Sequence, residues 1–113
     1  MRFARAIKAI IDERSQGSCE ICGIATPNGQ YHHRRPRGMG GSKRSETGSP
    51  VNALYLCQEC HVWIESLRDH ALRNGWLVRQ SHDPALIPVN YRGTWSTLTN
   101  EGMVNPVMPE STR

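Results

Sequence analysis

The sequence predicts a small α+β domain that is held together by a metal site. Its 113 residues suffice for one domain. Only 37% of them are hydrophobic, and ten glycines and seven prolines predict many turns, so the core must be small. The four cysteines form two Cys-x-x-Cys pairs, Cys19/Cys22 and Cys57/Cys60. A metal bound by these pairs would supply the cross-link that a loop-rich chain of this size needs.

The N-terminal half is expected to begin with a helix over residues 3–14. Ile7, Ile10 and Ile11 recur at helical spacing and give this segment one apolar face. The first cysteine pair follows, and a short strand is predicted at residues 30–34. Glycines and prolines then make residues 35–50 a long irregular loop, and such loops in compact domains are usually functional or disordered.

The C-terminal half is expected to contain a strand at residues 53–56 and a helix over 58–73 that stops at Asn74-Gly75. Further strands are predicted at 76–79 and 95–99, followed by a loose tail. The predicted buried stripe of the helix is Trp63, Ile64, Leu67 and Ala71. The expected divisions are an N-terminal helix (1–18), a core with the cysteine site (19–73), C-terminal strands (74–99) and a tail (100–113).

The cysteine pairs are interpreted as ligands of one structural zinc ion. The N-terminus is amphipathic and lacks the apolar stretch of a signal peptide, and no run is long enough to span a membrane. A cytoplasmic location is therefore expected, where thiols stay reduced and paired Cys-x-x-Cys motifs typically bind zinc. Disulfides, free thiols, or haem attachment at Cys57 to His61 are alternatives. Haem attachment would need export and would leave the first pair without a role.

A basic segment is the clearest charge feature of a chain whose net charge is +4. Between residues 31 and 45 it contains no acid and five basic residues: Arg34, Arg35, Arg37, Lys43 and Arg44. A solvated basic loop is one explanation. Beside candidate catalytic histidines, contact with the phosphate backbone of DNA is the other.

The order of motifs resembles the HNH endonuclease family, also called the ββα-metal or His-Me finger fold, in its zinc-knuckle form. The motifs are Cys-x-x-Cys, His32-His33-Arg34-Arg35-Pro36, Gly40-Gly41, Asn52 and Cys57-x-x-Cys60-His61. The likeness covers residues 19–73, and the flanks resemble small HNH proteins of actinobacterial phages. Each motif alone is a weak signal, and their order makes the resemblance specific.

The resemblance implies a role for each of four residues. His32 and His61 would bind a catalytic divalent metal (Mg²⁺, Mn²⁺, Ni²⁺ or Zn²⁺), and His33 would be the general base that activates water. A histidine with a pKa near 6.5 suits that task. Asn52 would brace the loop between the strands and so orient His33. The alternatives are a surface His61, two loop histidines without a special role, and a turn asparagine.

Several other residues receive weaker assignments. Glu65 occupies the position, four residues after His61, where many relatives carry a third metal ligand, and a carboxylate could ligate Mg²⁺ or Mn²⁺. A solvent-facing helix residue is the equal alternative. His70 and His82 match no motif and are expected at the surface. Three tryptophans are expected to pack in the core or on the sheet rather than stack on bases: Trp63, Trp76 and Trp95.

The resemblance implies a metal-dependent endonuclease that hydrolyses phosphodiester bonds of double-stranded DNA, in the host cytoplasm if the chain is phage-encoded. Two alternatives belong to other classes. A non-catalytic zinc-knuckle DNA-binding module would need the cysteines and basic residues but not the histidines together. An accessory protein of the phage packaging machinery would need only the zinc-stabilised fold.

Overall fold

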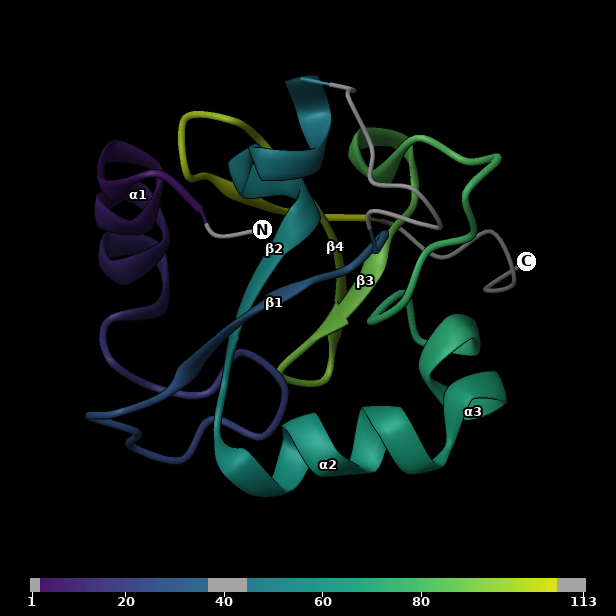
Figure 1. Ribbon diagram of the computed structural model, residues 1–113, viewed down its shortest axis with the longest axis horizontal. Helices are drawn as coiled ribbons and strands as arrows, with labels where there is room; N and C mark the ends of the chain where they lie inside the picture. The colour runs from purple at the N-terminus through teal and green to yellow at the C-terminus, as the bar shows by residue number, and fades with distance from the viewer. Residues whose placement is uncertain (1–2, 37–44, 108–113) are drawn as a thin grey trace.

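The computed structural model describes residues 3–36 and 45–107, and it confirms the predicted α+β class. Figure 1 shows the arrangement of the elements. In chain order they are α1 (Arg5–Ser15), β1 (Gln30–His33), η1 (Ser45–Gly48), η2 (Pro50–Asn52), β2 (Ala53–Leu56), α2 (Gln58–Ser66), α3 (Arg68–Arg73), η3 (Pro84–Leu86), β3 (Val89–Tyr91), β4 (Thr94–Leu98) and β5 (Val104–Pro106). Within the described residues, no helix has both the length and the apolar character needed to cross a membrane.

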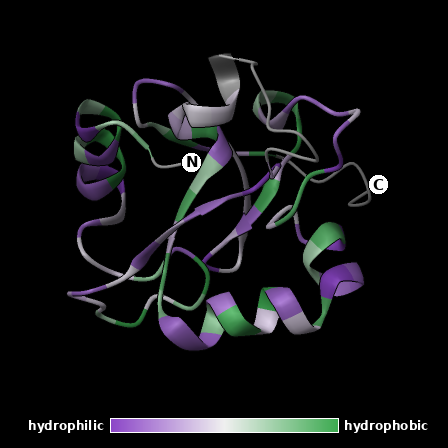
Figure 2. Ribbon diagram, in the orientation of Figure 1, coloured by the Kyte–Doolittle hydropathy of each residue, from purple (hydrophilic) through white to green (hydrophobic). Residues whose placement is uncertain are grey.

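The centre of the fold is an antiparallel hairpin of β1 and β2, in which His32 is opposite Leu54 and His33 is opposite Ala53. Every residue of β2 is buried. Figure 2 shows the contrast with β1, which is mostly hydrophilic. Successive side chains of a strand point to opposite faces of the sheet. Accordingly, Ala53 and Tyr55 pack in a small cluster with Ile11 of α1, while Leu54 and Leu56 belong to the main core.

A buried ion pair connects the N-terminal helix to this hairpin. Arg14 at the end of α1 binds Glu20 with two nitrogen–oxygen distances of 2.7 Å, and both side chains are almost fully buried. Glu20 also accepts hydrogen bonds from the N–H of Tyr55 and the hydroxyl of Tyr91. The charges are therefore compensated inside the protein, and the pair joins α1, the first cysteine loop, β2 and β3.

The predicted continuous helix over residues 58–73 is wrong, because the chain breaks it at Leu67. Leu67 has φ −126° and ψ 67°, so α2 ends before it and α3 begins after it. Ile64 and Ala71 are buried as expected, whereas Trp63 and Leu67 are 42% and 46% exposed. The change of direction divides the predicted stripe between α2 and α3. Of its four residues only Ile64 in α2 and Ala71 in α3 are buried.

The C-terminal sheet also differs from its prediction. Residues 76–79 form no strand. Trp76, Leu77 and Val78 are nevertheless buried, and Trp76 and Leu77 pack in the main core. The apolar character of this segment therefore reflects burial and not strand pairing. The sheet has the order β3-β4-β5. Only β4 was predicted, since nearby prolines suggested a turn where β3 lies. The tail prediction is wrong for β5, and residues 108–113 lie outside the described residues.

Candidate functional site

The four cysteines converge on one point between the first loop and the start of α2. Cys57 is the N-cap of α2 and Cys60 lies in its first turn, while Cys19 and Cys22 come from the loop after α1. All four sulfur atoms lie within 4.8 Å of one another, and the Sγ atoms of Cys22 and Cys57 are 3.8 Å apart. A tetrahedral site with zinc–sulfur bonds of about 2.3 Å needs sulfur separations of about 3.8 Å. The cluster can therefore hold a metal ion such as zinc.

Backbone hydrogen bonds favour the thiolate of Cys19, whereas burial raises the pKa of the Cys22 and Cys60 thiols. The N–H of Ile21 lies 3.4 Å from Cys19 Sγ, and the N–H of Cys60 lies 3.5 Å from Cys57 Sγ. Burial raises the pKa of the Cys19 thiol, but hydrogen bonds to it outweigh burial and lower the pKa to about 7. Gly23 has φ +84°, a conformation that L side chains rarely adopt, which closes the first turn. A closed site of four thiolates is structural, because it leaves zinc no open position.

His32 and His61 lie next to each other beside this cluster. Their ring centroids are 5.8 Å apart in an edge-on arrangement, with His32 on β1 and His61 on α2. Nε2 of His32 is 2.9 Å from the carbonyl oxygen of Trp76, and because a carbonyl only accepts, this nitrogen carries the proton. Nδ1 of His32 is consequently the nitrogen available to a metal. Burial lowers the pKa of His32 to about 4, so the ring is neutral near pH 7, as ligation requires.

His33 does not face the same way as His32. Its ring stacks on Phe3 with centroids 4.0 Å apart and an angle of 15° between the planes. A strand break near these histidines would have allowed both to share one face. Instead, β1 pairs regularly through His33, and the N–H of Arg34 still bonds to the carbonyl of Asn52. The ring contacts of the two histidines therefore lie on opposite sides of the hairpin.

Asn52 makes the bracing hydrogen bonds that were expected of it. It is fully buried, and its Oδ1 accepts the N–H of Arg35 at 2.7 Å. Its Nδ2 donates to the carbonyls of Arg35 at 3.1 Å and Thr47 at 2.8 Å. The side chain thereby ties the end of β1 to the segment before β2. A solvated turn asparagine would not be buried with three such partners.

Arg34 and Arg35 are buried and cannot form the predicted contacts with phosphate. Arg34 is completely inaccessible and donates to four carbonyls, those of Val51, Gly75, Pro84 and Ile87. Burial lowers its pKa to about 9, which keeps it charged at neutral pH. Arg35 is 3% exposed and donates to the carbonyl of His82. The other three predicted contacts, Arg37, Lys43 and Arg44, lie outside the described residues.

Glu65 is exposed on α2 and does not join the histidine pair. Within residues 3–36 and 45–107, the four cysteines are the only group of three or more potential metal ligands. Glu65 is thus a solvent-facing helix residue here. Glu65 was considered as a third metal ligand only because it lies four residues after His61. That spacing places the two side chains on one face of α2, but it does not bring the Glu65 carboxylate close to His32 on β1.

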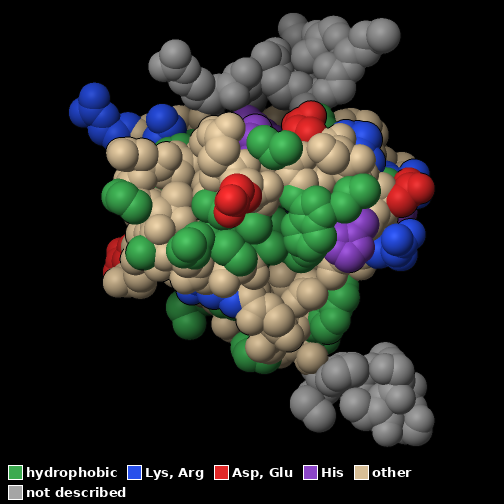
Figure 3. Space-filling model, turned by 90° about the horizontal axis from the view of Figure 1, so that it is seen from below, with side chains coloured by type: hydrophobic (Ala, Val, Ile, Leu, Met, Phe, Trp, Pro, Cys, Tyr) green, Lys and Arg blue, Asp and Glu red, His purple; other side chains and the backbone are tan. Residues whose placement is uncertain are grey.

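The remaining histidines and the three tryptophans differ in their burial. His70, which was expected at the surface, is half-buried between Trp63 and Trp76, with ring centroids 5.0 and 5.4 Å away. His82 is exposed, as expected. Trp76 is buried as predicted, whereas Trp63 and Trp95 are exposed. Figure 3 views the molecule from the α2 side and shows hydrophobic side chains gathered on this face next to a histidine.

Two contacts of the site had no signal in the sequence. The carbonyl that fixes the His32 tautomer belongs to Trp76, 44 residues away, and the ring that covers His33 belongs to Phe3. Both depend on how distant segments pack. In comparisons with known proteins, no family model matches this chain and no curated protein matches it.

Proposed function

We propose that this chain is a metal-dependent endonuclease of the HNH type that hydrolyses phosphodiester bonds of double-stranded DNA. The observation that carries the proposal is the position of His32 against His61, on a β-hairpin followed by a helix, beside a four-thiolate cluster. The hairpin, helix and histidine pair match what the motif order implies for a ββα-metal centre. The phage origin and the packaging role rest on the resemblance alone.

The two imidazoles would hold the catalytic divalent metal. Nδ1 of His32 is available because Nε2 donates to the carbonyl of Trp76, and the His61 ring on α2 lies 5.8 Å from the His32 ring. A donor set of two nitrogens suits Zn²⁺ or Ni²⁺ better than Mg²⁺, which prefers oxygen. When bound, the metal would supply Lewis-acid stabilisation of the charge that develops on the phosphate.

The protein's own groups have separate tasks in this proposal. The Trp76 carbonyl holds His32 in one tautomer, and Asn52 fixes the end of β1, next to the two histidines. His33 is assigned as the base that removes a proton from the attacking water, and this role rests on its position in the motif. Its ring stacks on Phe3, and its Nε2 is buried.

The test is nicking of supercoiled plasmid by the purified zinc-loaded protein with Mg²⁺, Mn²⁺, Ni²⁺ or added Zn²⁺. His61→Ala should weaken metal binding, and excess metal should partly restore its rate. His33→Ala should lose on the order of 10²–10⁴ in rate without rescue by metal. Glu59→Ala, an exposed change on the same helix, is the matched control and should nick at the wild-type rate.

One observation favours a second candidate, a non-catalytic zinc-knuckle DNA-binding module. In the described part of the chain the histidine pair has no third protein ligand, whereas the cysteine site is complete. This candidate predicts DNA binding without nicking under any of the four metals. If wild type binds DNA and its plasmid stays supercoiled in all of them, the endonuclease proposal is wrong and the module is the better account.

A further inference from the structure

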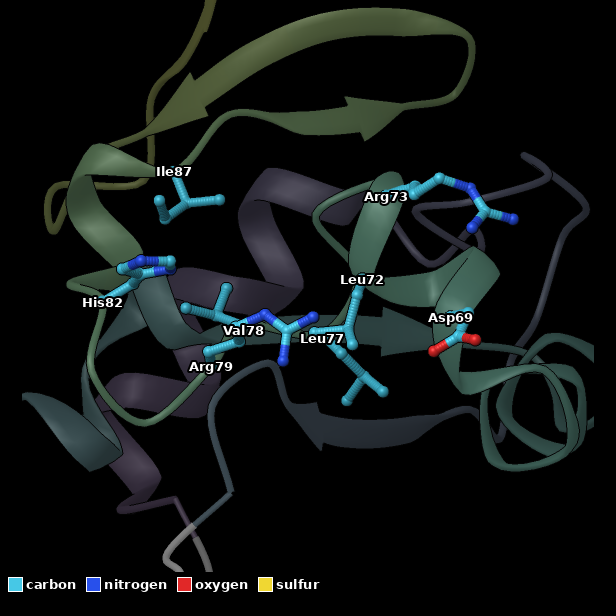
Figure 4. Close-up of a pocket in the computed structure, with 8 residues that line it drawn as sticks. All are labelled: Asp69, Leu72, Arg73, Leu77, Val78, Arg79, His82 and Ile87. Atoms are coloured by element: carbon cyan, nitrogen blue, oxygen red, sulfur yellow. The ribbon is translucent and has the colours of Figure 1, made fainter.

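A groove runs between α3 and the segment that follows it. One cavity of about 420 Å³ is lined by Leu72 and Arg73 of α3 and by Leu77, Val78 and Arg79 of the later segment. Figure 4 shows the Arg79 guanidinium lying in the middle of this cavity, toward Leu72. A second cavity of about 380 Å³ shares four of these residues, so the two are parts of one groove.

The groove carries positive charge that the protein does not use. The second cavity adds Arg68 to Arg73 and Arg79, and all three side chains are exposed. In residues 3–36 and 45–107, no hydrogen bond or ion pair is made by any of the three guanidinium groups. Asp69 is the only acid that lines either cavity. Three arginines and one acid thus line the two cavities, together with the apolar side chains of Leu72, Leu77 and Val78.

The buried arginines fix the wall of the groove. Arg34 donates to the carbonyls of Gly75 and Ile87, which flank the segment that contains Arg79. Arg35 donates to the carbonyl of His82 within that segment. The wall is therefore held in one conformation, which reduces the entropy cost of placing Arg79 on a ligand.

The same wall begins at the candidate catalytic pair. The carbonyl of Trp76 accepts the hydrogen bond from His32, and the next residue, Leu77, already lines the groove. The groove wall is therefore connected, through adjacent residues of the chain, to the carbonyl that orients His32. This continuity distinguishes the groove from a basic surface elsewhere on the molecule.

We propose that Arg68, Arg73 and Arg79 bind the phosphate backbone of double-stranded DNA along this groove and position it for cleavage. The planar guanidinium matches two phosphate oxygens at once, and apolar residues between the arginines can contact deoxyribose. This assignment rests on the proposed function. It replaces the phosphate contacts expected of the buried Arg34 and Arg35 by contacts of exposed arginines, and Arg34 and Arg35 instead hold the segment that carries Arg79.

The experiment measures binding of a fluorescently labelled 20-base-pair duplex by anisotropy from 50 to 300 mM salt, without added divalent metal, so that no cleavage is required. The test variant is Arg73→Gln/Arg79→Gln. The control is Arg5→Gln/Lys8→Gln on α1, on the opposite side of the molecule from α3 (Figure 1), which removes the same charge.

Each phosphate contact releases counterions, so the loss of one contact reduces the slope of log affinity against log salt by about 0.9. Each contact also contributes about tenfold to the affinity at 50 mM salt. The test variant should therefore bind about a hundredfold more weakly at 50 mM, with a slope smaller by nearly two. The control should bind within a few-fold of wild type.

Equal losses in both variants would mean that only net charge matters, and the groove assignment would be wrong. It would also be wrong if the test variant bound like wild type, or if wild type did not bind the duplex at 50 mM salt. Since nicking is not measured here, a wild type that binds through the groove but never nicks would contradict the proposed function alone.

Discussion

Replacing Arg34 by methionine separates a structural role from contact with DNA. Methionine keeps most of the aliphatic stem but removes the hydrogen bonds that Arg34 donates to the carbonyls of Val51, Gly75, Pro84 and Ile87. The Pro84 carbonyl keeps a second donor, the N–H of Ile87. The four carbonyls come from three separate parts of the chain. We therefore expect Arg34→Met to destabilise the whole fold.

The expected loss follows from the acceptors that lose their donor, which are the carbonyls of Val51, Gly75 and Ile87. A buried acceptor without its donor costs about 1–3 kcal/mol, so these carbonyls together cost between about 3 and about 9 kcal/mol. Removing a charged group that burial disfavours returns part of this cost. A net loss of about 3 kcal/mol remains, which for a domain of this size corresponds to a fall of about 12 °C in Tm.

Urea unfolding with zinc present, followed by circular dichroism and tryptophan fluorescence, measures this loss. Arg79→Met is the matched control, because Arg79 is exposed and should change the free energy of unfolding by no more than about 0.5 kcal/mol. If Arg34→Met does not fold, Arg34→Lys, which keeps the charge and up to three donors, should show a measurable intermediate loss. A variant as stable as wild type that instead loses DNA affinity would refute the structural role.

Three further predictions concern the sites around the hairpin. The wild-type chain should hold one zinc ion by elemental analysis, and Cys19→Ser or Cys57→Ser should lose it and unfold; unchanged melting of zinc-free protein would contradict this. Because burial lowers the folded-state pKa of His32 from an unfolded value near 6.5 to about 4, protonation favours unfolding. Stability should thus be complete above pH 6.5 and decline by about 3 kcal/mol as pH falls toward 4, and His32→Gln should remove that part of the urea-midpoint shift. Asn52→Asp replaces two donated hydrogen bonds by repulsion from carbonyls and should cost about 2–4 kcal/mol. If protease cut the Asn52→Asp variant between residues 35 and 50 no faster than it cuts wild type, that bracing role would be contradicted.

Features that depend on local chemistry could be predicted from the sequence. Two Cys-x-x-Cys pairs bring two thiols together within a few residues, and only the meeting of the pairs requires the fold. The strand at 53–56 was predicted at its observed bounds because a short apolar run ended by a cysteine turn has few alternatives. The nearness of His61 to His32 was expected only from the resemblance, because it joins two separate elements.

The fates of the arginines could be decided only by the tertiary structure. Arg34 and Arg35 occur in a basic, loop-rich segment, where exposed arginines are the rule, and nothing in their neighbours distinguishes them. Arg34 is buried because carbonyls from residues 17 to 53 positions away converge around its guanidinium. Such acceptors are backbone atoms that every residue has, so no side-chain pattern encodes them. The sequence determined which ligands, turns and strands are available, while the long-range packing of backbone carbonyls determined which charges became structural and which remained at the surface.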